Sequence, residues 1–400
     1  MRKKRLISLV LGFSLVLGLT ACGSSGGGTS AEATETPKAT EEAVKEAANE
    51  VTDDKADTST AADADIPESV QGNIKIAVIR NQPPNYHTEQ NLAGCKEEGE
   101  QLGWTVDTFI TNSDNEKIQE VVAQCIDKGY DGLIVSHALQ PYAYDMLKPA
   151  RDKGIAVVTN DSEPFDADGN ILEGVTNTMQ DDRGYAEQSI GYLLEDLAAD
   201  GVEKPKFVKL FQGPGYPNLD RRDEVYTRIL SEGKFEELEV VTPSEPLDIR
   251  GEFATKISAI LPRYPKGSVD GFWCFYDEPA IGALQALNDI GRTDIKVCFT
   301  DVSDEVLNLM YTNRDVFRAT SACDPFLLGK AQIRLMALKL AGEETPDEYI
   351  LKSVLIKADD INESTTMENL SEVIKEWGPG LIDDLNRPWL DALKEKNGAS

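Results

Sequence analysis

The chain has 400 residues, with 40 Lys and Arg against 70 Asp and Glu, and a formal net charge of −30. This charge repels the phosphates of nucleic acid, so no nucleic acid is expected as a partner. The six cysteines form no CxxC pair and no Cys/His cluster, so we expect no metal site.

The first 22 residues have the pattern of a secretory signal. Basic residues at positions 2–5 precede an apolar run over residues 6–19. This run is shorter than the roughly 20 residues of a membrane span, which favours a signal peptide over residues 1–21 rather than a transmembrane anchor. The ending Leu19-Thr20-Ala21-Cys22 resembles the lipobox of bacterial lipoproteins. That resemblance implies a lipid on Cys22, and with it attachment to the extracytoplasmic face of the cell membrane.

The next fifty residues are poor in large apolar side chains. Gly, Ser, Thr, Ala and acidic residues dominate up to Gly72. Such a segment buries too little apolar surface to offset the entropy lost on ordering. We therefore predict a disordered acidic tether over residues 22–72 and a folded body that starts at Asn73.

The folded body repeats an apolar strand followed by a helix with one apolar stripe. In the first series we predict strands over residues 74–80, 106–111, 133–136 and 155–160. In the second series we predict strands over residues 207–211, 238–241, 271–276 and 295–300, with helices over residues 185–197, 219–230 and 252–261. A further helix is predicted after Asp277, with an apolar stripe from Ala280 to Ile290. Two late strands, over residues 317–322 and 353–356, flank a helix over residues 326–340.

Continuously apolar strands joined by amphipathic helices are typical of parallel sheets that are buried on both faces. The sequence therefore predicts an α/β fold with two Rossmann-like parallel-sheet lobes joined by a hinge. The first lobe is expected to contain residues 73–178 and about 324–349, and the second lobe residues 179–323 and about 350–365. Residues 366–400 are expected to form an acidic tail outside both sheets.

Three local strings resemble the type I periplasmic substrate-binding proteins of sugar ABC transporters, most closely the galactose/glucose-binding subgroup. Asp161-Ser162-Glu163-Pro164 is similar to its N-K-E-P. Residues 213–218, with Arg222 beyond them, are similar to its G-H-P-D-x-x-x-R loop, and residues 276–284 to its N-D-x-x-A-x-G-A. The resemblance covers about residues 73–360. The subgroup has His at the position of Tyr216 and Asn at the positions of Tyr276 and Cys323, so the identity of the sugar stays open.

Polar and aromatic residues follow the predicted strands, at the edge where open α/β sheets bind ligands. Carboxylates and a guanidinium can bond adjacent hydroxyls of a sugar, and an aromatic ring can cover its C–H face. The resemblance implies that Tyr86 stacks on the sugar while Asp161, Asn218, Arg222 and Asp301 bond its hydroxyls. The predicted ligand-binding set is Tyr86, His87, Asp161, Tyr216, Asn218, Arg222, Tyr276, Asp277 and Asp301.

Several residues also have a structural interpretation. Asp277 can be the N-cap of the helix that follows it. Tyr276 can belong to the sheet core, and Arg222 can form a surface ion pair with Asp220 or Glu224. Trp273 is expected in the core. Residues 166–170 are expected to form a turn rather than a calcium loop, and Cys274 with Cys298 is the cysteine pair best placed for a disulfide.

These observations predict an extracytoplasmic solute-binding lipoprotein, a monomer that captures a hexose-like sugar between its lobes and delivers it to an ABC permease. The alternative is a receptor of the same fold that presents its ligand to a membrane sensor kinase. No enzyme activity and no cofactor are expected, because the chain has no P-loop, GxGxxG or HExxH motif and no credible nucleophile–His pair.

Overall fold

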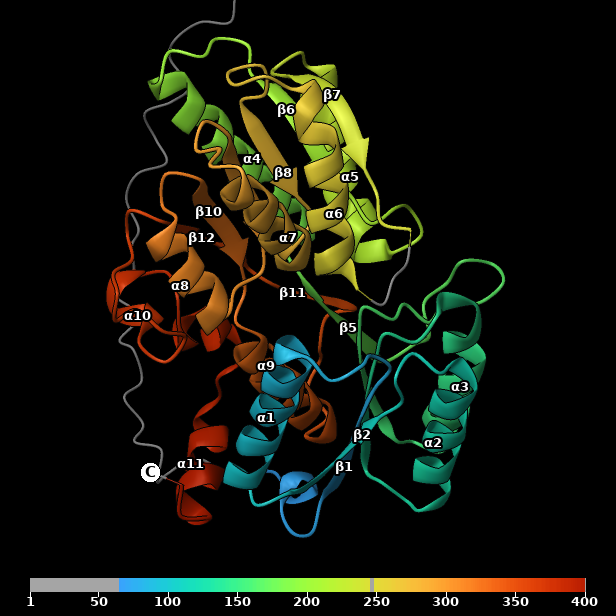
Figure 1. The fold of residues 1–400 in the computed structure, drawn as a ribbon. Helices are drawn as coiled ribbons and strands as arrows, with labels where there is room; N and C mark the ends of the chain where they lie inside the picture. Colours follow the sequence, from blue (N-terminus) through green and yellow to red (C-terminus); the bar gives the residue numbers. More distant parts are fainter. Residues whose placement is uncertain (1–64, 245–247, 400) are drawn as a thin grey trace, which may run out of the picture. The chain divides into compact units, whose positions relative to one another are not determined.

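The computed structural model describes residues 65–244 and 248–399. The signal peptide, Cys22 and most of the predicted tether therefore lie outside the described residues. The described residues form two six-stranded sheets with helices on their faces, as the α/β prediction requires (Figure 1).

The first sheet has the strand order β11-β5-β4-β3-β1-β2, and all its neighbouring strands are parallel. Its strands are β1 (Lys75–Arg80), β2 (Thr105–Ile110), β3 (Gly132–Ser136), β4 (Ala156–Asn160), β5 (Val175–Gln180) and β11 (Glu348–Leu351). Helices α1 (Tyr86–Gln101) and α9 (Pro325–Leu340) cover one face, and α2 (Asn115–Asp127) and α3 (Gln140–Asp152) cover the other.

The second sheet has the order β12-β10-β9-β8-β6-β7. Its strands are β6 (Lys206–Leu210), β7 (Glu236–Val241), β8 (Gly271–Cys274), β9 (Lys296–Thr300), β10 (Phe317–Ala322) and β12 (Val354–Lys357). Helices α4 (Asp182–Ala199) and α5 (Pro217–Ser231) pack on one face; α6 (Ile249–Ile260), α7 (Asp277–Asp289) and α8 (Asp304–Thr312) pack on the other.

One strand departs from the predicted parallel arrangement. β12 runs antiparallel to β10. It follows β11 of the first sheet after only two residues. The chain therefore enters the second sheet from the carboxyl edge of the first and must run in the opposite direction.

Polar side chains secure the segments that connect the lobes. The first connection runs from β5 to α4, where Asp181 caps α4 by accepting from the Gly184 N–H. The Ser353 hydroxyl, in the link from β11 to β12, donates to the same carboxylate at 3.0 Å. The Tyr185 hydroxyl accepts from the Cys323 N–H at 2.8 Å, just before α9. These bonds join the three connecting segments into one hinge region.

Helices α1 and α9 pack with their backbones in contact, which only glycine allows. A Cβ at Gly94 would lie 1.9 Å from the Phe326 carbonyl oxygen, and one at Gly329 would lie 2.2 Å from the Asn91 oxygen. This packing brings polar residues of both helices next to the carboxyl end of β1.

The folded body begins before Asn73, where the tether was predicted to end. Residues Glu68–Val70 form a short 3-10 turn, and Val70 is buried. The Trp104 indole N–H donates to the Val70 carbonyl at 3.0 Å. The prediction of a tether through Gly72 was therefore wrong for residues 68–70. The buried Val70 side chain and the hydrogen bond to its carbonyl hold these residues on the folded body.

The C-terminal segment is packed on both lobes rather than left as a free tail. Leu370, in α10 (Leu370–Val373), and Trp377 join the core of the second lobe. Trp389 and Leu393, in α11 (Pro388–Lys396), join the core of the first lobe. The segment lies outside both sheets, as predicted, but it contributes to both cores.

The five described cysteines are buried and free, so Cys274 and Cys298 form no disulfide. Trp273 is buried, as predicted, and its indole N–H donates to the Ser189 hydroxyl at 2.9 Å. Residues 166–170 form a turn in which the Asp166 carboxylate accepts from the N–H groups of Asp168 and Asn170.

Candidate functional site

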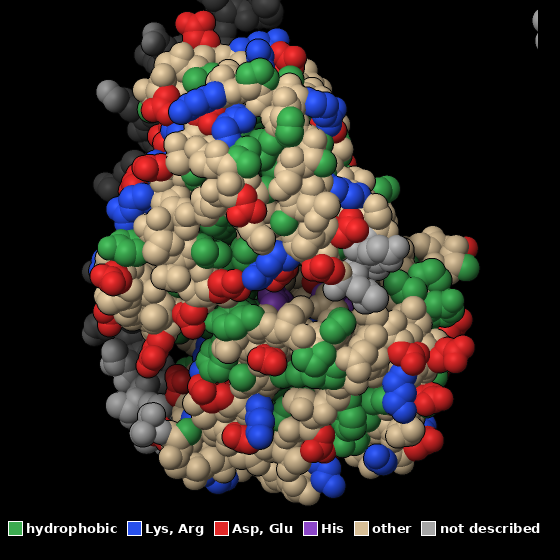
Figure 2. All heavy atoms as spheres, in the orientation of Figure 1, with side chains coloured by type: hydrophobic (Ala, Val, Ile, Leu, Met, Phe, Trp, Pro, Cys, Tyr) green, Lys and Arg blue, Asp and Glu red, His purple; other side chains and the backbone are tan. Residues whose placement is uncertain are grey.

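The carboxyl ends of the two sheets face a hollow in which histidine side chains are visible (Figure 2). We call this hollow the interlobe cleft. Arg221 of α5 crosses it: one guanidinium nitrogen lies 3.0 Å from the Asp161 carboxylate and another 4.0 Å from Glu163. Side chains from both lobes therefore meet in the cleft.

Three residues directly after strands have a left-handed backbone. The φ angles of His137, Asp161 and Asp301 are 60°, 47° and 73°, at the ends of β3, β4 and β9. Each backbone N–H still donates to the neighbouring strand, at 3.0–3.2 Å. A non-glycine residue in this conformation costs about 1–2 kcal/mol, and such strain is concentrated at functional sites. Two of these strained residues, Asp161 and Asp301, belong to the predicted ligand-binding set and lie at the cleft.

Arg222 is fully engaged in the second lobe. Its guanidinium donates to the buried Asp182 carboxylate at 2.9 Å and to the Thr300 hydroxyl at 2.7 Å. It also lies over the Tyr185 ring and 4.0 Å from the Asp301 carboxylate. The predicted alternative, a surface ion pair with Asp220 or Glu224, was wrong, because α5 turns Arg222 inward onto α4.

Asp277 and Tyr276 lie between the end of β8 and the start of α7. Asp277 is the first residue of α7, after the N-cap Tyr276, and its carboxylate accepts from the Glu278 N–H at 2.9 Å. Burial and the negative charge of Asp301 raise the pKa of Asp277 to about 8. The Tyr276 hydroxyl donates to the Gln212 amide at 2.5 Å, and its ring packs on the core of the second lobe. Burial and the charge of Asp301 thus both favour the protonated form of Asp277.

Three predicted residues lie at helix starts around the cleft. Tyr216 precedes α5 and is 45% exposed, and Asn218 is half-buried in the first turn. Tyr86 is the half-buried first residue of α1. Burial, with Asp304 and Asp324 nearby, raises the pKa of Tyr86.

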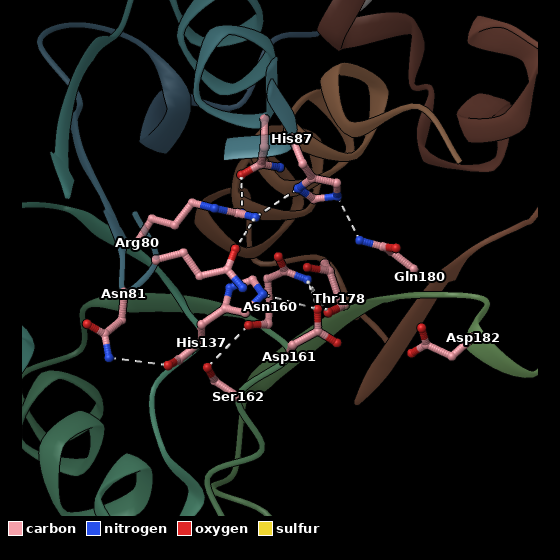
Figure 3. Close-up of polar contacts among 12 residues, drawn as sticks. Arg80, Asn81, His87, His137, Asn160, Asp161, Ser162, Thr178, Gln180 and Asp182 are labelled. Atoms are coloured by element: carbon pink, nitrogen blue, oxygen red, sulfur yellow. Dashed lines mark hydrogen bonds and ion pairs between the residues drawn. The ribbon is translucent and has the colours of Figure 1, made fainter. Parts of the chain in front are cut away.

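The first lobe contributes a buried polar row whose residues lie outside the predicted ligand-binding set. Arg80, Ser136, Asn160 and Thr178 are aligned across β1, β3, β4 and β5 by the strand register. All four are buried. Figure 3 shows Arg80, Asn160 and Thr178 of this row, with His87, Gln180 and Asp161 around them. The row brings one cation and several neutral polar groups to the carboxyl edge of the sheet.

Arg221 and Asp182 were also missed. Asp182 opens α4 and accepts from both Arg221, at 2.8 Å, and Arg222. The sequence contained one signal for this cluster, which was the pair of adjacent arginines in the first two turns of a predicted helix. It did not reveal their partner Asp182, which lies about forty residues earlier in the chain. Burial and Asp182 raise the pKa of Asp161 to about 6, with Arg221 acting in the opposite direction.

No group of three or more His, Cys, Asp or Glu among residues 65–244 and 248–399 is arranged to hold a metal ion. Within the same residues, no helix has the length and apolar character needed to cross a membrane. The cleft chemistry of the described residues is therefore that of hydroxyl, amide, carboxylate and guanidinium groups.

Comparison with known proteins places this arrangement in a family. Residues 76–344 match the model of the periplasmic binding protein domain. A sugar ABC transporter structure from Yersinia enterocolitica subsp. enterocolitica 8081 is 36% identical, with a TM-score of 0.73 over 84% of this chain and 99% of that one.

Two more distant relatives agree in fold or sequence. A 5-methylthioribose transporter solute-binding protein from Thermotoga lettingae TMO is 24% identical, with a TM-score of 0.70 over 83% of this chain and 100% of that one. A D-apiose import binding protein from Actinobacillus succinogenes is 24% identical over 58% of this chain and 71% of its own length. The chain belongs to the periplasmic binding proteins and has the type I fold of the solute-binding proteins of sugar ABC transporters.

Proposed function

We propose that this protein captures a neutral, hexose-sized sugar in the interlobe cleft and delivers it to an ABC permease. The observation that carries the proposal is the convergence of polar side chains from both lobes, with Arg221 of the second lobe on Asp161 of the first. The 36% identical Yersinia protein, named as a sugar ABC transporter, supports the same class of ligand. We assign the protein to transport rather than to catalysis.

The balance of charge in the cleft supports a neutral ligand. Three guanidinium groups, those of Arg80, Arg221 and Arg222, accompany the carboxylates of Asp161, Asp182 and Asp301, and the Glu163 carboxylate lies 4.0 Å from Arg221. The carboxylates would repel an acidic ligand, and the arginines would repel a cationic one. The hydroxyls of a neutral ligand can donate to the carboxylates and accept from the arginines.

We propose that the ligand contacts come from the residues that border the cleft in both lobes. The set is Tyr86, His87, Asp161, Tyr216, Asn218, Tyr276, Asp277 and Asp301, with Arg222 placed behind Asp301 and Asp182. Because Arg222 already donates to Asp182, Thr300 and the Phe275 carbonyl, it has little capacity left for a sugar. Asp301 is therefore the main polar anchor in the second lobe.

We further propose that a lipid on Cys22 anchors the protein, as a monomer, to the extracytoplasmic face of the cell membrane. The support is the signal pattern of residues 1–21 and the Leu-Thr-Ala-Cys ending. Palmitate labelling of the expressed protein tests this, with Cys22→Ala as the unlabelled control.

A thermal-shift screen of the full-length protein tests the ligand class. A bound ligand stabilises the folded state by mass action, by about 2.7 kcal/mol at a hundred times its Kd. We expect a neutral monosaccharide or polyol to raise the midpoint by several degrees, and Asp301→Asn to lose that shift. Asp289→Asn, at an exposed position, should keep it. A shift only with amino acids or nucleosides would contradict the proposal.

A further inference from the structure

The structure points to one ligand contact that the resemblance to the family does not provide. It begins at Arg80, which ends β1 and is fully buried. Its guanidinium donates to Thr88 and Asn91, both at 3.1 Å, to Gln82 at 3.3 Å and to His87 at 2.9 Å. All four partners are uncharged when His87 is neutral, and none is a carboxylate.

The contact with His87 fixes the state of the imidazole ring. A guanidinium has only donors, so the His87 Nδ1 atom must accept from Arg80. A neutral imidazole that accepts at Nδ1 carries its proton at Nε2, and a protonated ring would have no acceptor to offer. Burial, Arg80 and Arg222 lower the pKa of His87 to about 3, in agreement with this geometry.

The state of His87 in turn decides the orientation of the Gln180 amide. The His87 Nε2 atom lies 2.7 Å from the Nε2 position of the Gln180 amide, and two N–H groups cannot bond each other. Because Nε2 carries the proton, the amide must offer its oxygen to His87 and direct its NH2 group to the opposite side. That opposite position is buried, and no donor among the described residues reaches it, so it does not require an oxygen. Gln180 therefore directs its two N–H donors into this buried position.

The strand register places these donors beside an unused acceptor. Asn160 pairs with Thr178, and Gln180 follows Thr178 by two residues on β5, so Asn160 and Gln180 project from the same face of the sheet. The Asn160 NH2 group donates to the Thr178 carbonyl at 2.9 Å and to the Asp161 carboxylate at 3.3 Å. This fixes the Asn160 oxygen as an acceptor, and that oxygen is also buried without a partner. Figure 3 shows Asn160, His87 and Gln180 around the same space.

We propose that Arg80, acting through His87, holds Gln180 as a hydrogen-bond donor to the ligand, and that Gln180 is thereby a specificity-determining residue. The inference rests on the proposed binding of a sugar in the cleft. It requires the bound ligand to present an acceptor to Gln180 and a donor to Asn160, which two hydroxyls of a sugar can supply. Arg80 and His87 are positioning residues. Because Gln180 is the last residue of β5 before the chain passes to the second lobe, this contact also lies at the hinge region.

Nuclear magnetic resonance of the imidazole nitrogens tests the relay without any ligand. The chain has only two histidines, so His137→Gln assigns both sets of signals. The charged and titratable groups facing His87 are Arg80 from β1, Arg222 from α5 and His137 from the loop after β3. We expect the neutral Nε2–H tautomer of His87 from pH 8 to pH 5. In Arg80→Gln we expect the pKa of His87 to rise but to stay below its ordinary value, because burial and Arg222 still act on the ring. Protonation of wild-type His87 at pH 6, or the Nδ1–H tautomer, would overturn the relay.

A polarity swap at Gln180 tests its role in recognition. Gln180→Glu keeps the oxygen that accepts from His87 but replaces the donor with an acceptor. The probe is whichever of D-allose, D-apiose, D-galactose, D-glucose and 5-methylthioribose gives the largest midpoint shift with the wild type. We expect at least a tenfold loss of affinity by calorimetry for Gln180→Glu and for the uncharged Gln180→Leu. Gln124→Glu, exposed on α2, should bind like the wild type.

The outcomes separate the two proposals. If none of the five sugars shifts the wild-type midpoint, the proposed ligand class fails while the tautomer of His87 still tests the relay. If a sugar binds and the folded Gln180 variants bind it as tightly as the wild type, the assignment of Gln180 is wrong and sugar binding stands.

Discussion

The guanidinium of Arg221, in the second lobe, lies 3.0 Å from the carboxylate of Asp161, in the first lobe. Both side chains are largely buried, and Arg221 also donates to Asp182 at 2.8 Å. A charge pair in such a site is screened little by water, so it stabilises the arrangement in which the lobes are together. Ligand contacts to both lobes would favour the same arrangement.

Replacing Arg221 with Gln should therefore favour separation of the lobes. Removing one partner of a largely buried pair leaves Asp161 uncompensated, and we expect a cost of about 1–3 kcal/mol to the closed arrangement. Solution scattering should show a larger radius of gyration for ligand-free Arg221→Gln than for the wild type. Arg228→Gln, at an exposed position of the same helix, is the control. Equal radii for both variants would refute a latch at Arg221.

Arg222 is expected to contribute more to stability than to direct recognition. Its removal would leave Asp182, whose side chain is 1% exposed, without one of its two partners. We expect Arg222→Ala to lower the free energy of unfolding in urea by about 3–5 kcal/mol. Arg183→Ala removes a surface pair with Glu224 and should cost less than about 1 kcal/mol. A similar small loss for Arg222→Ala would show that the buried pair is not structural.

The elements that the sequence predicted well are those whose apolar pattern is continuous. Residues 74–80 and 295–300 were recognised as strands because nearly every side chain is buried. β5 was missed because its sequence, Val-Thr-Asn-Thr-Met-Gln, looks polar, although its threonines and its asparagine are buried and hydrogen-bonded to β4 and to the segment before β11. Local patterns do not reveal partners that far away along the chain.

The family resemblance supplied candidate residues for the site but not the partners of these residues. Asp161, Arg222 and Asp301 do lie at the cleft, but the partners of Arg222 could not be read from α5 alone. The sequence placed Arg80 only at the end of a predicted strand. Its hydrogen bonds to Asn91 and His87 form when α1 packs on β1, so the sequence did not reveal them. Pairings across elements are set by tertiary packing, which one sequence does not display.

The C-terminal helix should stabilise the first lobe through Glu98. This carboxylate is fully buried, and it accepts from Arg334 at 2.6 Å and from Lys394 of α11 at 2.7 Å. Burial acts to raise the pKa of Glu98, but Arg334 and Lys394 outweigh it and the net shift is downward. A carboxylate with a lowered folded-state pKa contributes stability above its ordinary pKa, and this stability is lost as the pH falls through the folded value.

We therefore expect Glu98→Gln to lower the free energy of unfolding at pH 7 by about 2–4 kcal/mol. The difference from the wild type should shrink as the pH falls below about 4.5. Urea titrations at pH 7 and pH 4 measure both effects. The neighbouring Glu97→Gln, which removes an exposed pair with Lys330, is the matched control. A loss that is the same at both pH values would exclude the charge of Glu98 as its source.

Asp277 should have the opposite dependence on pH. Its folded-state pKa of about 8 lies above the ordinary value of 3.8, so the folded state binds more protons between these values. Stability is then lost as the pH rises from about 4 to 8. We expect Asp277→Asn to stabilise the ligand-free protein at pH 8 by about 1–3 kcal/mol and to have little effect at pH 4.

Thermal unfolding of Asp277→Asn at the two pH values gives the measurement, and Asp289→Asn at the exposed end of α7 is the control. A destabilised Asp277→Asn protein at pH 8 would show that the carboxylate is ionised and paired in the folded state.

Calorimetric titration of the full-length protein with neutral sugars tests the central claim most directly, when the wild type is compared with Asp301→Ala. Asp301 follows a buried strand in a strained conformation and borders the cleft, so its loss should leave ligand hydroxyls unpaired and cost about 1.5–3 kcal/mol, roughly ten- to a hundredfold in affinity. We expect one sugar to bind the wild type with one-to-one stoichiometry and to bind Asp301→Ala that much more weakly. Equal affinity for both proteins, or binding of only an amino acid, peptide or nucleoside, would contradict a sugar site in the interlobe cleft.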